Sequence, residues 1–331
     1  MIEYLLTLGI VAMEGRGFEY PTDSVVAPNG RLYVPNKSRD YGERGVRLTV
    51  LGLDSEFYGT FGTYGASEGK LQSPSGVEAT NDGRILVCDD YTHTINVFDL
   101  EGKFLNRWGR YGQGKGELDG PSGIAVDPEN NVYISDTRNH RIQKFNIDGL
   151  HLATFGKQGK NRGQFELPWG ISFTPRNTLC VADWGNSRIQ ELTIDGDVLS
   201  VIDNESSPSY ELKYPSAAVV DDNGITYIAD WGNERVKLIT DKDIMVQNLR
   251  GEGTVSKWAG EFLNTNVEEN TARQTSNMDI ELDFLEDNDP HSESAHIEKY
   301  FWSPVSIKLD TLNRVYVTET NRHRIQVYQQ A

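Results

Sequence analysis

The chain repeats itself every 47 residues over most of its length. Four prolines, at positions 74, 121, 168 and 215, stand 47 residues apart, and Pro21 and Pro304 extend the series by 53 and 89 residues. A fixed period of this size is typical of propellers and solenoids, in which each repeat buries its apolar face only against its neighbours. Six prolines therefore predict six repeats.

Each repeat has the pattern of four strands. The fullest copy contains short β-branched or aromatic runs at 121–127, 131–136, 139–145 and 151–156, separated by Asn, Asp or Gly. Such runs are typical of strands. Four strands with no helical pattern between them predict a blade of a β-propeller. We expect an all-β fold, with residues 1–331 forming a single six-bladed propeller.

The two ends of the chain predict how the ring closes. Residues 4–21 match residues 151–168, which form the end of one repeat and the start of the next. Residues 304–329 match a repeat that stops before its last strand. We therefore expect the N-terminal strand to complete the last blade and to cover a sheet edge that would otherwise stay open.

The repeats resemble those of the NHL-repeat propellers. The resemblance rests on residues 136–145, 183–190, 230–237 and 319–326, and on Phe-Gly-x-x-Gly-x-x-x-Gly tails that begin at Phe61, Trp108 and Phe155. It covers nearly the whole chain and implies the six-bladed fold. The family includes binding scaffolds, RNA-binding proteins and lyases, so the resemblance does not fix a function.

Charge and hydropathy narrow the classes of partner. The formal net charge of −17 argues against nucleic acid, because affinity for nucleic acid depends mainly on neutralising phosphates. No apolar stretch approaches the roughly 18–20 residues that a membrane span needs. Residues 5–13 are apolar, but they follow Glu3 and are needed as a strand, which argues against a secretory signal.

The two cysteines predict the compartment. Cys88 and Cys180 fall in the second strands of blades two and four, so blade three separates them and a disulfide is not expected. Two free thiols suit a reducing compartment, and we expect a cytoplasmic protein.

Two insertions interrupt the repeat on the same face. We call this the upper face: it carries the connections between blades and the loops between second and third strands. Residues 37–44 lengthen such a loop in blade one, and residues 251–303 lengthen the connection from blade five to blade six. Functional loops cluster on one side of a rigid scaffold, so the upper face is the predicted working face.

The longer insertion is acidic. Between Glu261 and Glu298 it has eleven acidic residues and one basic residue, Arg273. Residues 279–284 alternate acidic and apolar side chains, which predicts a strand with Ile280, Leu282 and Phe284 on one side. We interpret residues 251–303 as a flap over the upper face; the alternative is a solvated acidic loop that aids solubility.

Aromatic and basic residues are predicted to share the upper face. Trp169, Trp184 and Trp231 fall in its loops, where they would form an apolar pocket or cover the seams between blades. A row of arginines occupies one repeat position and supplies further candidates for ligand binding: Arg141, Arg188, Arg235 and Arg324.

Charged residues interrupt the inner strands of three consecutive blades. Asp23, Glu78 and Lys308 stand where other repeats have small or apolar residues, so we expect them to converge near the central channel. They are either a structural salt bridge or a site, in which Lys308 perturbs a catalytic carboxylate or the carboxylates hold a divalent cation. His291 and His296, in the insertion, are further metal candidates, whereas His93, His140 and His323 occupy a shared repeat position and are interpreted as repeat residues.

Two functions remain open. The first is a binding module that presents its upper face and acidic flap to a protein or small ligand. The second is a propeller enzyme with its site at the channel mouth, either a metal-assisted lyase or a lactonase-type hydrolase. The resemblance implies zinc-binding histidines just after some repeat prolines in the lyases, but here those positions carry Thr22, Ser75, Ser122, Trp169, Ser216 and Val305.

Overall fold

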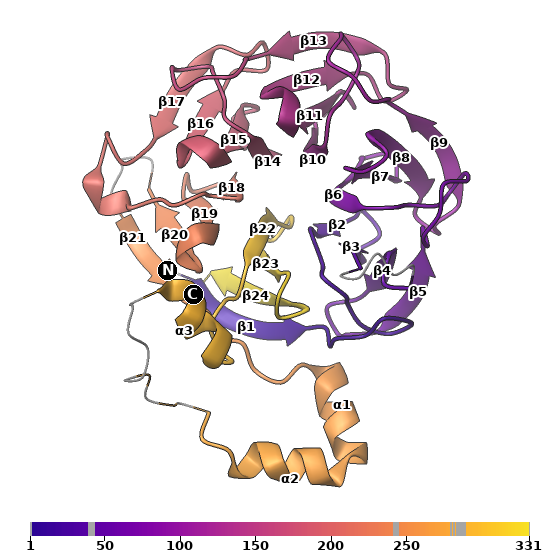
Figure 1. The fold of residues 1–331 in the computed structure, drawn as a ribbon, viewed down its shortest axis with the longest axis vertical. Helices are drawn as coiled ribbons and strands as arrows, with labels where there is room; N and C mark the ends of the chain where they lie inside the picture. The colour runs from indigo at the N-terminus through magenta and orange to yellow at the C-terminus, as the bar shows by residue number, and fades with distance from the viewer. Residues whose placement is uncertain are drawn as a thin grey trace.

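Six four-stranded antiparallel sheets form a ring around a central channel (Figure 1). The computed structural model describes residues 2–38, 44–240, 245–278, 280, 282 and 289–330. Each sheet is one blade, and its strands run in chain order from the channel to the rim, except in the last blade. The six-bladed, all-β fold expected from the repeats is confirmed.

The first five blades each come from one continuous segment. Blade one contains β2 (Val25–Val26), β3 (Leu32–Asn36), β4 (Arg47–Leu51) and β5 (Phe57–Phe61). Blade two contains β6 (Pro74–Ala79), β7 (Arg84–Asp89), β8 (Thr94–Asp99) and β9 (Phe104–Trp108). Blade three contains β10 (Pro121–Val126), β11 (Val132–Asp136), β12 (Arg141–Phe145) and β13 (His151–Phe155). Blade four contains β14 (Pro168–Phe173), β15 (Leu179–Asp183), β16 (Arg188–Leu192) and β17 (Val198–Ile202). Blade five contains β18 (Ala217–Val220), β19 (Thr226–Asp230), β20 (Arg235–Ile239) and β21 (Met245–Leu249).

Short 3-10 turns join some of these elements. They are η1 (Thr137–Asn139), η2 (Trp184–Asn186) and η4 (Trp231–Asn233), each after a second strand, and η3 (Pro208–Tyr210) before blade five.

Blade six is built from both ends of the chain. It contains β22 (Pro304–Leu309), β23 (Val315–Glu319), β24 (Arg324–Gln330) and, as its outer strand, β1 (Ile2–Leu8). β1 pairs antiparallel with β24, from Ile2 opposite Gln330 to Leu8 opposite Ile325. The predicted closure of the ring is therefore confirmed.

The apolar core lies between blades rather than inside one. Tyr33 and Val50 of blade one pack in one cluster with Val77, Ile85 and Phe98 of blade two, and similar clusters join the other neighbours. Burial of this surface supplies the main driving force for association of the blades. Cys88 and Cys180 are buried as free thiols, as expected.

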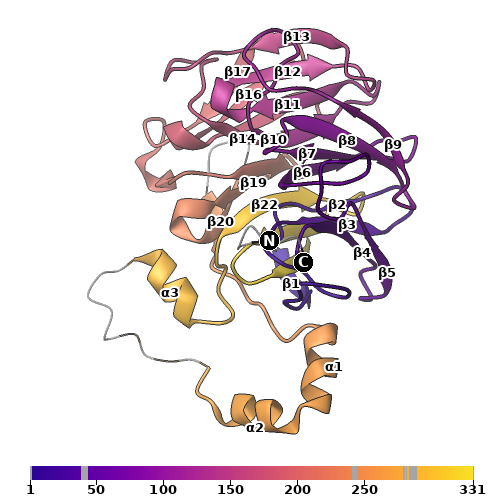
Figure 2. The same cartoon turned by 45° about the vertical axis from the view of Figure 1, so that its right-hand side comes forward.

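The described part of the long insertion contains three helices that were not predicted from the sequence. They are α1 (Lys257–Thr265), α2 (Val267–Thr275) and α3 (Pro290–His296). Ser256 caps α1 by accepting the Ala259 N–H, and the Asp289 carboxylate caps α3. Figures 1 and 2 show α1 and α2 projecting from the rim beside β1. Most of the alternating segment 279–284, including Phe284, lies outside the described residues, as do residues 39–43 of the shorter insertion. None of the helices in the described part of the chain is long and apolar enough to cross a membrane.

One tryptophan attaches α1 to the seam where the ring closes. Trp258 is 1% exposed and packs with Leu8 and Phe18, and its indole N–H donates to the Ser55 carbonyl at 2.7 Å. The start of the insertion is thus part of the core between blades six and one.

In three blades a histidine at one repeat position ties the blade to the next connection. The Nδ1 atoms of His93, His140 and His323 accept backbone N–H groups from Gly120, Leu167 and Tyr20, at 2.9–3.1 Å. All three histidines have left-handed backbone angles. This supports their interpretation as repeat residues.

His323 should make the stability of the ring depend on pH. Burial lowers its pKa to about 4, because desolvation disfavours the charged imidazolium form. A depressed histidine pKa contributes stability above the unfolded pKa of about 6.5 that is lost as pH falls towards 4. Between pH 7 and 4 we expect the wild type to lose about 2 kcal/mol more than His323→Gln, allowing for partial solvent screening. Urea unfolding of both proteins at the two pH values measures this difference; equal losses would contradict it.

Candidate functional site

Two rings of side chains surround the upper mouth of the channel. They come from equivalent repeat positions, so the six blades direct them towards one axis. The inner ring follows the repeat prolines and consists of Thr22, Ser75, Ser122, Trp169, Ser216 and Val305. The outer ring follows the last residue of each second strand and consists of Lys37, Asp90, Thr137, Trp184, Trp231 and Thr320.

Members of both rings enclose a recess of about 280 Å³ at this mouth. One wall is aromatic, with Trp169 and Trp231, and the opposite wall is charged, with Lys37 and Asp90. Hydroxyl groups form much of the remaining lining, including those of Thr22, Ser75, Ser122 and Thr320. A concave site with an apolar wall and a few convergent polar groups is the usual form of a ligand pocket.

The three tryptophans predicted for the upper face form one cluster. The ring centroids of Trp169 and Trp184 lie 6.0 Å apart, and those of Trp184 and Trp231 lie 6.2 Å apart. Tyr214 stacks on Trp184 at 4.6 Å. Trp184 therefore supports the other two, while Trp169, 38% exposed, and Trp231 face the recess.

The polar side of the recess contains one cationic side chain, one anionic side chain and several hydrogen-bond acceptors. Lys37 Nζ lies 2.7 Å from Asp90 Oδ2, and both side chains are partly exposed, so water or a ligand can compete for either charge. The hydroxyls of Thr22 and Ser75 donate to the carbonyls of Pro74 and Pro121 in the next blade. A hydroxyl that donates its proton in this way keeps its oxygen lone pairs as acceptors for a ligand.

The charged residues of the inner strands meet in the channel, as predicted. Lys308 Nζ lies 3.0 Å from Glu78 Oε2 and 3.9 Å from Asp23 Oδ2. Asp23 also accepts hydrogen bonds from the backbone N–H groups of Ser24 and Val77 and from the Ser306 hydroxyl.

This arrangement limits what Lys308 can do chemically. Burial lowers its pKa, but the carboxylates of Asp23 and Glu78 raise it more, so its pKa lies above the ordinary value. A protonated amine has no lone pair, so Lys308 cannot act as a nucleophile or base while these pairs are intact. The geometry is that of a buried ion-pair cluster.

The arginine row is held inside the scaffold. In each case Nε donates to the acidic residue that ends the second strand, at 2.7–2.8 Å: Asp136, Asp183, Asp230 or Glu319. Terminal nitrogens of Arg141, Arg188, Arg235 and Arg324 donate to backbone carbonyls of the preceding connection. Their side chains are 7–15% exposed. This placement gives the row a structural role, because each guanidinium joins the end of a second strand to the preceding connection.

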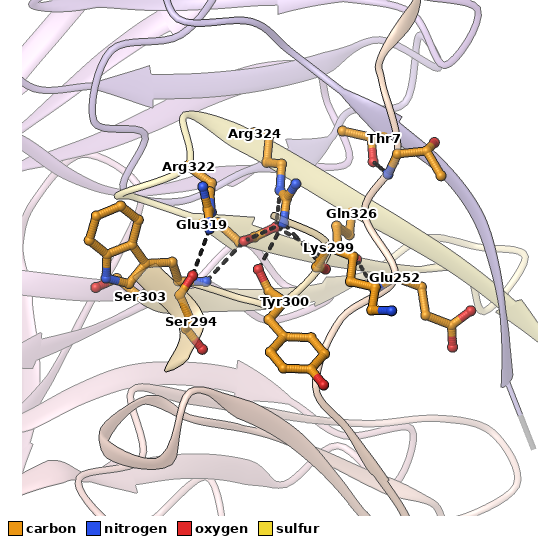
Figure 3. A network of polar contacts seen from close by, with 12 residues as sticks. Thr7, Glu252, Ser294, Lys299, Tyr300, Ser303, Glu319, Arg322, Arg324 and Gln326 are labelled. Carbon is orange, nitrogen blue, oxygen red and sulfur yellow. Dashed lines mark hydrogen bonds and ion pairs between the residues drawn. The ribbon is translucent and has the colours of Figure 1, made fainter. Parts of the chain in front are cut away.

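Blade six uses the same network to hold the end of the insertion (Figure 3). Arg324 and Gln326 bind Glu319, and Arg324 also donates to the Tyr300 carbonyl. Arg322 stands where blades three to five have asparagine, and it donates to the Ser294 and Ile297 carbonyls at the end of α3. A cation there also interacts favourably with the helix dipole.

Glu234 holds the start of α3. It occupies the repeat position of His93 and His140, and its Oε2 accepts the Ser303 N–H at 2.6 Å just as those histidines accept theirs. Its second oxygen, Oε1, lies 2.5 Å from His291 Nδ1. Burial raises the pKa of Glu234.

The metal candidates are not brought together. His291 contacts Glu234 and Trp302, and His296 Nδ1 donates to the Ser292 carbonyl, whereas Asp23 and Glu78 lie in the channel. Among the residues that the structure describes, no group of three His, Cys, Asp or Glu side chains is placed to hold a metal ion.

Family models match three parts of the chain. A model described as a 6-bladed beta-propeller matches residues 66–156, and the NHL repeat model matches residues 165–192 and 301–328. The chain is a six-bladed β-propeller with NHL repeats. No curated protein matches its sequence.

Solved structures share the fold of this NHL propeller at low sequence identity. Virginiamycin B lyase from Staphylococcus aureus is 11% identical, with a TM-score of 0.59 and full coverage of both chains. A protein of unknown function from Bacteroides thetaiotaomicron is 18% identical, with a TM-score of 0.60, covering 98% of this chain and 75% of that one. A chain of a nidogen/laminin complex is 20% identical, with a TM-score of 0.52, covering 69% and 79%. At these identities the likeness shows the fold alone.

Proposed function

We propose that this NHL propeller is a binding module that takes a small ligand, or one side chain of a protein partner, into the upper recess. The observation that carries the proposal is Trp169. It stands in a ring whose other members are small, and it presents an exposed indole to the recess. An exposed aromatic side chain in a concave site is typical of binding surfaces.

The two walls define the ligand that fits best. A flat apolar group would stack against Trp169 and Trp231, and a hydrogen-bond donor would reach the hydroxyl oxygens or Asp90. The size of the recess suits one aromatic group with a short polar arm, because pockets for whole drug-sized ligands begin at about 300 Å³. Of the proteins that share the fold, one is a lyase and one is part of a protein complex. These neighbours therefore do not favour a small ligand over a side chain of a protein partner.

Three indole probes test the proposal: tryptamine, indole-3-ethanol and indole-3-acetate. We expect saturable binding of tryptamine, weaker binding of the neutral alcohol and the weakest binding of the acid, because the lining is rich in acceptors and the protein is anionic. Chemical-shift changes of the indole N–H signals of Trp169 and Trp231 measure the binding.

Trp169→Ala should weaken tryptamine binding by about tenfold or more, since stacking on an aromatic face is worth on the order of 1–3 kcal/mol. Tyr91→Ala is the matched control, because Tyr91 is an exposed aromatic residue in blade two, 69% exposed, that does not line the recess. Equal binding by wild type and Trp169→Ala, or no binding of any probe, would refute the proposal.

A further inference from the structure

A second recess opens at the other end of the channel, on the lower face. It measures about 400 Å³. Its wall includes the last residues of five of the six inner strands: Val26, Val126, Phe173, Val220 and Leu309. This apolar collar follows from the repeat, because equivalent positions in the six blades meet around one axis.

The floor of this lower recess is charged. Glu78 and Lys308 both line it, with side chains 21% and 14% exposed. Asp23, Glu78 and Lys308 carry a formal sum of one negative charge. Glu78 accepts one hydrogen bond from Lys308 and one from the Ala79 N–H, and a carboxylate has about four lone-pair positions, so about two remain for a donor in the recess.

The channel between the two recesses is too narrow to join them. The space lined by Asp23, Ser75, Ser122 and Lys308 amounts to about 20 Å³, which is room for about one water molecule. A ligand in the lower recess therefore has no route to Trp169 at the upper mouth.

We infer that the lower recess is a separate binding site for a small organic monocation, a primary ammonium group on a short apolar chain. The ammonium group would donate to Glu78, and the chain would lie against the valine and leucine collar. The formal excess of one negative charge at the floor attracts a cation. The rim adds the carboxylate of Asp222, whereas Asp310 is already paired with Arg314 at 2.6 Å. The net charge of −17 also raises the local concentration of cations.

A divalent metal ion fits this floor less well. Lys308 Nζ lies only 3.0 Å from Glu78 Oε2, so a second cation of double charge would be repelled. No third acidic, histidine or cysteine ligand joins Glu78 and Asp23 within the described residues. An anion would face the carboxylates of Glu78 and Asp222 against the single ammonium group of Lys308, because Asp310 is paired with Arg314.

The test uses n-butylammonium as the probe, with n-butanol as its neutral and butyrate as its anionic counterpart. We expect n-butylammonium to cause saturable shifts of the Val126 and Val220 methyl signals, with a dissociation constant at least tenfold lower than that of n-butanol. Butyrate should cause no shifts. Glu78→Gln should weaken n-butylammonium binding tenfold or more. Trp169→Ala should leave it unchanged, which separates this site from the upper recess.

A second variant covers the case in which Glu78→Gln does not fold. Val126→Lys adds a positive charge at the half-buried collar without touching the ion-pair cluster, and should weaken n-butylammonium binding at least fivefold. Equal affinity for n-butanol and n-butylammonium would overturn the inference, as would Val126→Lys binding n-butylammonium as tightly as the wild type.

Discussion

Deleting residues 1–9 should destroy the closed ring. This segment contains the outer strand of blade six, Ile2–Leu8, in which Leu8 is fully buried and Ile2 is 5% exposed. Without them the edge of β24 would be open, and an unpaired edge is a template for aggregation. Loss of one buried leucine alone costs about 2–5 kcal/mol. Loss of the whole strand should approach the total stability of a typical domain, on the order of 5–15 kcal/mol.

Thermal unfolding and size-exclusion chromatography measure the outcome of this truncation. We expect no cooperative transition near that of the wild type, and elution as aggregates. Leu8→Asp should reproduce much of the loss, while Glu3→Lys, an exposed change in the same strand, should leave the melting temperature nearly unchanged. A truncated protein that melts at the wild-type temperature would show that the strand does not close the ring.

The sequence predicted this closure because the repeat supplies its own template. When residues 4–21 match residues 151–168, each residue inherits a position in a strand, on a face and around the axis. The same reasoning placed Asp23, Glu78 and Lys308 together and gathered the tryptophans on one face. Equivalent positions of the inner strands face one axis in a closed ring, so the repeat alone predicts which residues lie close together.

The insertion had no such template. Its alternating segment 279–284 suggested a strand, yet the helices lie on either side of it, and the local signals for them were overlooked. Ser256 and the Asp289-Pro290 pair are ordinary helix starts. A flap over the upper face would rest on the loops that carry the tryptophans. α3 does contact η4, which carries Trp231, but α1 is anchored instead by Trp258 at the seam between blades six and one.

The residues that hold the insertion could have been found as substitutions at fixed positions of the repeat. Glu234 replaces a histidine and Arg322 replaces an asparagine, and these two residues hold α3. The arginine row, predicted as candidates for ligand binding, has a structural partner in each blade. Each arginine follows an acidic residue by five positions and forms a buried pair with it. Charged residues that recur at the same position of the repeat thus hold the blades together. Charged residues that depart from the repeat hold the insertion.

Lys37 and Asp90 were also missed, although their positions could be found in the sequence. Both follow the last residue of a second strand, where Trp184 and Trp231 stand in blades four and five. Aligning that one position across all six blades yields the outer ring of the upper mouth. The volume of the recess, in contrast, depends on side-chain packing and cannot be obtained from the alignment.

Lys308→Met should be the most costly single substitution in the channel. It would leave the carboxylates of Asp23 and Glu78 close together without their cation, and breaking a buried ion pair costs about 3–5 kcal/mol. The cost arises from uncompensated charge, so the triple variant Lys308→Met, Asp23→Asn, Glu78→Gln should lose less stability than Lys308→Met alone. Denaturant unfolding of all combinations gives the coupling energies.

Lys37→Met is the matched control for Lys308→Met. It breaks a Lys–Asp pair of 2.7 Å whose side chains are 30% and 25% exposed, so water can solvate the remaining carboxylate. An exposed pair of this kind is worth about 0–1 kcal/mol. The nearest nitrogen–oxygen distances of the two lysines are similar, 3.0 Å for Lys308 and 2.7 Å for Lys37, so the contrast compares a buried cluster with an exposed pair. If Lys308→Met cost no more than Lys37→Met, or if the three channel substitutions were additive, the cluster would not be a coupled unit.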